Sequence, residues 1–190
     1  MTTCEEKFQG IVLAVCKTSD ELSKALKKYI KANVNDLLFF CIGTDRSTGD
    51  SLGPFIGTFL KGLGYINVMG TIDEPIHAMN LDEYISKVPK EKIVIAIDAA
   101  MGEYKNIGNI YLKSGSLFPG SALKKDLTPI GDFNISVVLC EDQRFPFLNF
   151  KTVSNVRLKN VIKLAKTITE SIQNAFPITN INEYKLEELI

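Results

Sequence analysis

The chain has 190 residues, of which 45% are hydrophobic, and this is enough for one hydrophobic core but short for two. Lysine and arginine together number 22, as do aspartate and glutamate, so no overall positive field exists that would hold nucleic acid or an anionic membrane. We therefore expect a single domain over residues 1–190 that recognises its partners locally and binds neither nucleic acid nor a membrane.

The cysteines and the hydropathy pattern favour a cytoplasmic protein. The four cysteines lie far apart and form no C-x-x-C pair, which is typical of reduced thiols. The first ten residues are polar and carry both charges, unlike a secretory signal peptide. No apolar run approaches the ~18 residues that a membrane span requires.

The first predicted helix follows residue 18. Thr18 and Glu21 have the spacing of a capping box, in which the two residues satisfy each other's backbone N–H groups at a helix start. An apolar stripe follows at helical spacing, made of Leu22, Ala25, Leu26, Tyr29 and Ile30. We therefore predict that residues 1–36 form a helical extension.

The chain is organised around residues 37–54. The six consecutive apolar residues 37–42 are typical of a strand buried on both faces in a parallel sheet. A loop of small and polar residues, 43–51, comes next, and apolar residues then recur at helical spacing over 52–63. In open α/β sheets such a loop lies at the carboxyl edge of the strands, where ligands bind.

Two further strands precede residue 100. Residues 67–72 are predicted as a short strand that ends in the polar loop 73–77, and residues 81–88 as a helix. Residues 93–97 are predicted as the most hydrophobic strand of the chain, and Asp98 stands directly at its end.

The second half is predicted to contain two strands and a long helix. In chain order its segments are a strand over 107–113, a loop over 114–132, a strand over 133–140, a polar and aromatic loop over 141–151, a helix over 153–176 and an acidic tail over 177–190. The alternation favours a three-layer α/β/α sandwich with a mostly parallel central sheet, whose core is residues 37–176. The strands at 37–42 and 93–97 are expected to be neighbours in its middle.

If these two strands are neighbours, Asp50 and Asp98 approach each other at one edge of the sheet. An unpaired charge costs several kcal/mol to bury, so such a carboxyl needs a partner, a metal or a raised pKa. Two adjacent carboxyls cannot both ionise easily, and one can serve as general acid while the other acts as base toward water. The alternative is that Asp50 caps the helix that begins at Ser51, and that Asp98 caps a turn.

The same edge offers other kinds of site. The loop 43–53 could cradle a phosphate, although it lacks the spacing of the common nucleotide-binding motifs. Oxygen ligands for magnesium, calcium or manganese are a second alternative, with candidates Asp45, Asp50, Glu74, His77 and Asp98. His77 fits a loop residue satisfied by the backbone as well as a ligand or proton shuttle. Arg46 could hold a carboxylate or a phosphate.

Several motifs resemble a known family. Residues 41–54, Cys-Ile-Gly-Thr-Asp-Arg-Ser-Thr-Gly-Asp-Ser-Leu-Gly-Pro, closely resemble the signature of the sporulation protein YyaC family, a group of proposed spore proteases from endospore-forming bacteria. The likeness continues in order through residues 73–81, 96–99, 119–122, 131–132 and 155–158. It implies a cytoplasmic protein of the mother cell or forespore of such a bacterium.

More distantly, the loop is similar to a segment of the germination protease and of hydrogenase maturation endopeptidases, which implies a phosphorylase/hydrolase-like sandwich. Two essential aspartates of the germination protease fall on Asp50 and Asp98, and in the hydrogenase enzymes the same positions bind metal. Ser121 lies in a Pro-Gly-Ser stretch that also resembles the germination protease. His77 comes too early to match the histidine of the hydrogenase enzymes, which argues against nickel-linked processing.

Two functions from different classes follow. The first is a sporulation-associated endopeptidase in which Asp50 and Asp98 activate water, with or without a divalent metal bound by the same pair. Residues expected to support its protein or peptide substrate are Asp45, Arg46, Glu74, His77 and Ser121. The second is a non-catalytic sporulation factor that binds a peptide or protein with the same loops, and a metal-dependent hydrolase of another substrate is a third, weaker option. The sequence does not specify an oligomeric state.

Overall fold

The computed structural model describes residues 10–119, 127–143 and 145–178. In these residues six strands form one sheet in the order β1-β5-β6-β4-β2-β3. Their bounds are Ile11–Cys16 (β1), Leu37–Cys41 (β2), Val68–Met69 (β3), Ile93–Gly102 (β4), Ile110–Ser114 (β5) and Phe133–Glu141 (β6). Only the β1–β5 and β5–β6 pairs are antiparallel, so β5 runs against the other strands. The predicted α/β fold with a mostly parallel sheet is confirmed.

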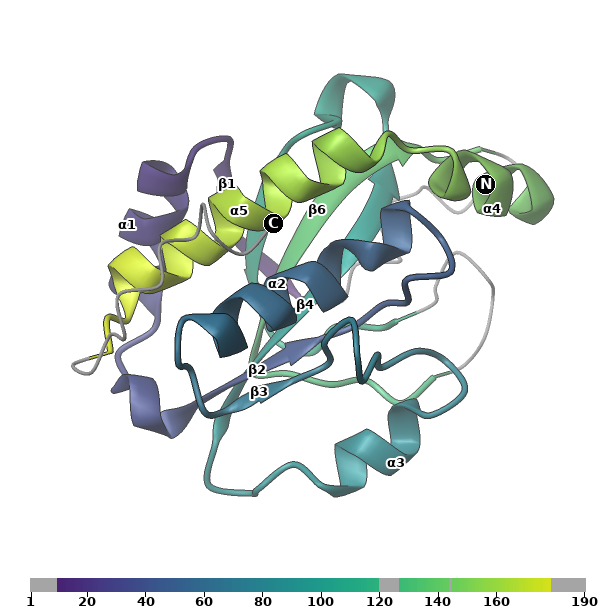
Figure 1. Cartoon of the computed structure of the whole chain (residues 1–190). Helices are drawn as coiled ribbons and strands as arrows, with labels where there is room; N and C mark the ends of the chain where they lie inside the picture. The colour runs from purple at the N-terminus through teal and green to yellow at the C-terminus, as the bar shows by residue number, and fades with distance from the viewer. Residues whose placement is uncertain (1–9, 120–126, 144, 179–190) are drawn as a thin grey trace.

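Helices cover both faces of the sheet and make it the middle of three layers (Figure 1). The α-helices are Ser19–Tyr29 (α1), Leu52–Gly62 (α2), Leu81–Ser86 (α3), Pro146–Ser154 (α4) and Leu158–Ala175 (α5), and the short 3-10 helices are Val34–Asp36 (η2), Gly49–Ser51 (η3) and Tyr104–Asn106 (η4). One face carries α1, α2 and α5, and the other carries α3. No helix in the described ranges is long and apolar enough to cross a membrane.

The two central strands are apolar on both faces because each face has its own core. Phe39 and Ile95 pack with the apolar sides of α1, α2 and α5. Phe40 and Val94 point the other way, since side chains alternate along a strand, and they pack with α3. Burying each large apolar side chain stabilises the fold by about 1.5–3 kcal/mol. β2 and β4 are parallel neighbours, as predicted.

The sequence analysis missed a strand at the start of the described chain. The predicted capping box of α1 is present, with the Glu21 N–H donating to Thr18 Oγ1 at 3.3 Å. Residues 1–36 are nevertheless not purely helical, because β1 pairs with β5 and forms one edge of the sheet. A short, uncharged apolar run fits a strand or a buried helix equally well, and its partner strand lies far along the chain.

The helical part of the second half also differs from the prediction. The predicted loop 141–151 contains most of α4, which has a proline in its first turn, where the missing N–H costs nothing. α4 ends at Ser154, the N–H of the next residue, Asn155, donates to the carbonyl groups of Lys151 and Thr152, and α5 then begins separately. The predicted single helix over 153–176 is therefore two helices. The predicted tail lies outside the described residues from residue 179 onward.

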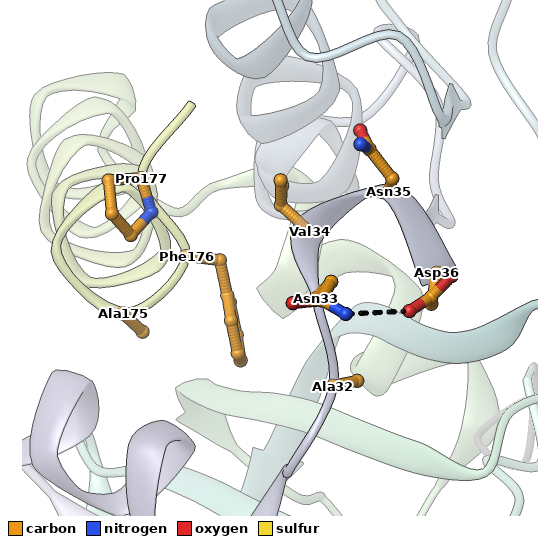
Figure 2. Close-up of a pocket in the computed structure, with 8 residues that line it drawn as sticks. All are labelled: Ala32, Asn33, Val34, Asn35, Asp36, Ala175, Phe176 and Pro177. Atoms are coloured by element: carbon orange, nitrogen blue, oxygen red, sulfur yellow. Dashed lines mark hydrogen bonds between the residues drawn. The ribbon is translucent and has the colours of Figure 1, made fainter. Parts of the chain in front are cut away.

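A hollow of about 470 Å³ lies at the amino edge of the sheet, between the segment before β2 and the end of α5 (Figure 2). Its lining residues are Ala32, Asn33, Val34, Asn35, Asp36, Ala175, Phe176 and Pro177. Within this hollow, Asn33 Nδ2 donates to Asp36 Oδ2 at 3.4 Å. None of the residues proposed for the site from the sequence lines it.

Candidate functional site

Asp98 lies where β2 and β4 separate. The pairing of these strands ends with Cys41 opposite Ile97, and the Ile42 N–H donates to the Ile97 carbonyl at 2.8 Å. β4 continues beside β6, with Asp98 opposite Ser136. The sequence analysis predicted Asp98 at the end of a strand, but it lies inside β4, because the residues after it still pair with β6. The point at which neighbouring strands of an open sheet part is a common place for ligands.

Asp50 reaches this place through the loop that follows β2. It belongs to η3, directly before α2. The Thr44 N–H donates to the Asp50 carbonyl at 3.1 Å, which folds the loop back over the end of β2. At Gly43 the φ angle is +146°, and a Cβ there would lie 1.9 Å from the Asp50 carbonyl oxygen. Only glycine fits this position, so Gly43 is what allows the loop to bring the backbone of Asp50 this close to the end of β2.

Asp50 is close enough to Asp98 for its charge to perturb the ionisation of Asp98. Burial raises the pKa of Asp98 well above its usual value, and the charge of Asp50 raises it further. Burial also raises the pKa of Asp50, but a hydrogen bond from the Ser47 hydroxyl opposes this rise. As pH rises, the pair therefore loses its first proton from Asp50, and Asp98 keeps the second.

A backbone hydrogen bond to Asp98 opposes the rise of its pKa and also distinguishes its two oxygens. The Ala99 N–H donates to Asp98 Oδ1 at 2.8 Å, so this oxygen acts as an acceptor. A proton held by the carboxyl fits on Oδ2.

Asp50 is not the cap of α2, because the N-cap residue of that helix is Ser51. The capping interpretation of Asp50 is thus not what the structure shows.

Two residues that the sequence analysis did not single out lie beside the pair. Ser47 is buried, hydrogen-bonds Asp50, and has its Oγ 3.4 Å from the Oγ of Ser154 in α4. Cys140 ends the buried part of β6, and burial, with the nearby charges of Asp50 and Asp142, raises its pKa to about 11. Its thiol is therefore protonated at neutral pH. The apolar run that ends at Cys140 was the available sequence signal.

Four of the other predicted site residues are exposed or lie outside the described chain. Asp45 and Arg46 are exposed in the loop after β2. Glu74 is exposed and lies 3.9 Å from Lys61, in a separate polar hollow of about 280 Å³. Ser121 lies outside the described residues. Their support of a substrate stays a prediction.

His77 is held within its own loop. Its Nδ1 accepts the Met79 N–H at 3.2 Å, and its backbone N–H donates to Asn80 Oδ1 at 2.8 Å. The ring therefore presents Nε2–H when it is neutral. Of the two interpretations of His77, the geometry favours the loop residue satisfied by the backbone.

A metal at the pair would have few protein ligands. Within the described residues, no three histidine, cysteine, aspartate or glutamate side chains come together as a metal site. Asp50 and Asp98 alone would suit an ion such as magnesium, which binds one or two carboxylates and keeps several waters. The wider set of ligands proposed from the sequence is not gathered in one place.

Comparison with known proteins shows similarity over most of the chain. Residues 13–171 match the family described as "Protein of unknown function (DUF1256)". The chain is 36% identical over 173 residues to "Uncharacterized protein YyaC" of Bacillus subtilis (strain 168), an alignment that covers 88% of this chain and 80% of that protein. The crystal structure of the NiFe hydrogenase maturation protease HycI from Thermococcus kodakarensis KOD1 is similar with a TM-score of 0.47 and 18% identity, covering 78% of this chain and 98% of HycI. The resemblance to the YyaC family is confirmed, and the chain belongs to the DUF1256 family.

Proposed function

We propose that this protein is a peptidase in which Asp50 and Asp98 hydrolyse a peptide bond with one water molecule. The observation that carries the proposal is the unequal proton affinity of the two carboxyls. The pKa of Asp98 is raised more strongly than that of Asp50, and the charge of Asp50 contributes to this rise. Such a pair holds one base and one acid at the same pH, which is what hydrolysis of an amide requires.

The proposed reaction moves two protons in opposite directions. The Asp50 carboxylate takes a proton from water while the water oxygen attacks the peptide carbonyl carbon, and Asp98 gives its proton to the carbonyl oxygen. When the resulting intermediate collapses, the C–N bond breaks, the leaving nitrogen takes the proton from Asp50, and the hydroxyl on carbon returns its proton to Asp98. Both carboxyls end in their starting states.

The position of the pair supports access by a substrate. Asp50 and Asp98 are both partly exposed, although most of their surroundings are protein. They lie at the carboxyl edge of the sheet, where open α/β sheets bind ligands. By resemblance to the YyaC family, we propose that the substrate is a protein made during sporulation or germination and that the enzyme acts in the cytoplasm of the mother cell or forespore.

The test is cleavage of a protein extract from sporulating cells, read by mass spectrometry of new chain termini. Wild-type protein should generate discrete termini. Asp50→Asn and Asp98→Asn should lower the cleavage rate by roughly a thousandfold, within the range that general acid–base groups contribute. Asp36→Asn, an exposed aspartate at the opposite edge, should cleave as the wild type does.

Two outcomes would contradict the proposal. Cleavage retained by Asp98→Asn would remove the pair from the mechanism. No cleavage by the wild-type protein under any condition would leave hydrolysis without support, and the role of a non-catalytic binding factor would replace it.

A further inference from the structure

Helix α4 exposes an unusual number of large apolar side chains. Phe147 is 75% exposed and Phe150 is 58% exposed, and Phe145, directly before the helix, is 65% exposed. Leu148 is also exposed. A contiguous apolar surface that is exposed to water usually marks a place where another molecule binds.

This helix is attached to the loop that carries Asp50. A Cβ at Gly49 would lie 2.8 Å from the Val153 carbonyl oxygen, so the loop and the end of α4 are in close contact. Ser154, Phe150 and Phe147 are four and three residues apart, which places them on one stripe of the helix. Because Ser154 meets Ser47, this stripe leads outward from the loop of Asp50.

The carboxyl end of α4 and the start of α5 are rich in basic residues, whereas the acidic Glu141 and Asp142 precede α4, and Asn149 Nδ2 donates to Asp142 Oδ1 at 2.8 Å. Residues 145–169 include no aspartate or glutamate, although the whole chain has equal numbers of acidic and basic residues. Their basic residues are Lys151, Arg157, Lys159, Lys163 and Lys166. Lys151, Arg157 and Lys159 are exposed at the junction of α4 and α5. Figure 1 shows this junction beyond the end of β6, next to the start of α5.

We propose that α4 and the start of α5 bind an acidic, apolar segment of the polypeptide substrate beside the bond that is cleaved. This inference rests on the proposed peptidase function. Apolar side chains of the segment would cover Phe147 and Phe150, and its carboxylates would lie near Lys151 and Lys159. Aromatic side chains are enriched at the centres of protein interfaces, and charges of opposite sign guide the partners together.

The charge of this surface selects a polypeptide of opposite sign over a second copy of the chain. In a two-fold symmetric dimer each surface meets itself, so the basic residues of two copies would repel each other. An anionic membrane would also complement the charge. We favour the polypeptide because the apolar stripe begins at the loop that carries Asp50, and the test includes the membrane as a competing outcome.

The experiment measures peptide binding to the full-length Asp98→Asn protein, so that the peptide is not consumed. The probe is a fluorescein-labelled synthetic peptide with two phenylalanines flanked by glutamates, titrated by fluorescence anisotropy. One control peptide has lysines in place of the glutamates, and another has alanines in place of the phenylalanines. Both control peptides should bind at least tenfold more weakly.

Surface variants made in the same protein locate the binding site. Phe147→Ser with Phe150→Ser should weaken binding at least tenfold, whereas Ile66→Ser, which changes another highly exposed apolar residue, should not. Lys151→Glu with Lys159→Glu should also weaken binding at least tenfold. The charge-matched pair Lys27→Glu with Lys90→Glu, at exposed positions in α1 and before β4, should leave binding unchanged.

The outcomes separate the docking surface from the peptidase. Binding that is absent, or that is unaffected by the α4 variants, overturns the docking proposal even if the wild type cleaves proteins. Binding to phosphatidylglycerol vesicles that depends on Phe147 and Phe150, without peptide binding, also overturns it. Peptide binding that depends on α4, together with no cleavage by the wild type, supports the docking surface and contradicts only the hydrolysis.

Discussion

The two edges of the sheet differ in what they expose and what they bury. At the amino edge, the hollow in Figure 2 is lined by polar and apolar side chains that include Phe176, and Asp36 is exposed and hydrogen-bonded to Asn33. At the carboxyl edge, Asp50 and Asp98 have pKa values raised by burial, and α4 exposes phenylalanines to water.

The carboxyl edge has two features that lower the stability of the fold. Keeping a carboxyl in a poorly solvated place and leaving aromatic side chains in water both oppose folding, so neither is expected at an edge that has only a structural role. The following changes test this comparison.

The largest expected effect on stability is at Gly43. Gly43→Ala should lower the free energy of unfolding by roughly 3 kcal/mol or more, because the added Cβ would collide with the Asp50 carbonyl and the φ angle disfavours alanine. Gly108→Ala is the matched control. Its φ angle is also positive, at +88°, but no atom lies within 4 Å of the added Cβ, so the cost should be about 1 kcal/mol. Equal costs in urea denaturation would contradict the tight loop.

The second effect is a pH-dependent gain of stability in Asp98→Asn. An unfolded aspartate ionises near ~3.9, whereas folded Asp98 holds its proton to higher pH. The wild type therefore loses stability as pH rises from about 4 until Asp98 itself ionises, by about 1.4 kcal/mol for each unit of raised pKa. Asparagine does not titrate, so the stability of the variant should gain on that of the wild type as pH rises above about 4, until Asp98 ionises. The same dependence of stability on pH in the wild type and in Asp98→Asn would contradict the raised pKa of Asp98.

The third effect is on the pH profile of cleavage. Activity should fall at low pH as Asp50 takes up a proton and at high pH as Asp98 loses its own, which produces a bell-shaped profile. Ser47→Ala removes a hydrogen bond that lowers the pKa of Asp50, so the acid limb should move to higher pH while the alkaline limb stays in place. Ser154→Ala keeps that hydrogen bond and should not move the acid limb. An unchanged profile in Ser47→Ala would show that Ser47 does not tune Asp50.

The smallest expected effect is that of a chelator. Within the described residues, no group of three histidine, cysteine, aspartate or glutamate side chains could hold a metal ion, so treatment with EDTA should leave the rate of cleavage within about twofold of the untreated rate. A large loss that magnesium restores would instead place a metal on Asp50 and Asp98.

Local sequence patterns predicted much of the fold. The capping box of α1, the helix after Ser51 and the central strands were all read correctly, because each depends on residues close together in the chain. The neighbouring positions of β2 and β4 followed from their unbroken apolar runs, and the approach of Asp50 and Asp98 followed from that.

Contacts between distant segments decided the rest. β1 forms a strand because it pairs with β5, which lies about a hundred residues later in the chain. α4 is a separate helix, and its end packs on Gly49. Ser47 became part of the site because its loop folds back toward Asp50, and no spacing in the sequence records that turn. By itself the sequence determined which segments are apolar and where the two aspartates follow them. Only the tertiary structure decided which carboxyl keeps the proton, because burial and the distance between charges arise when the chain is folded.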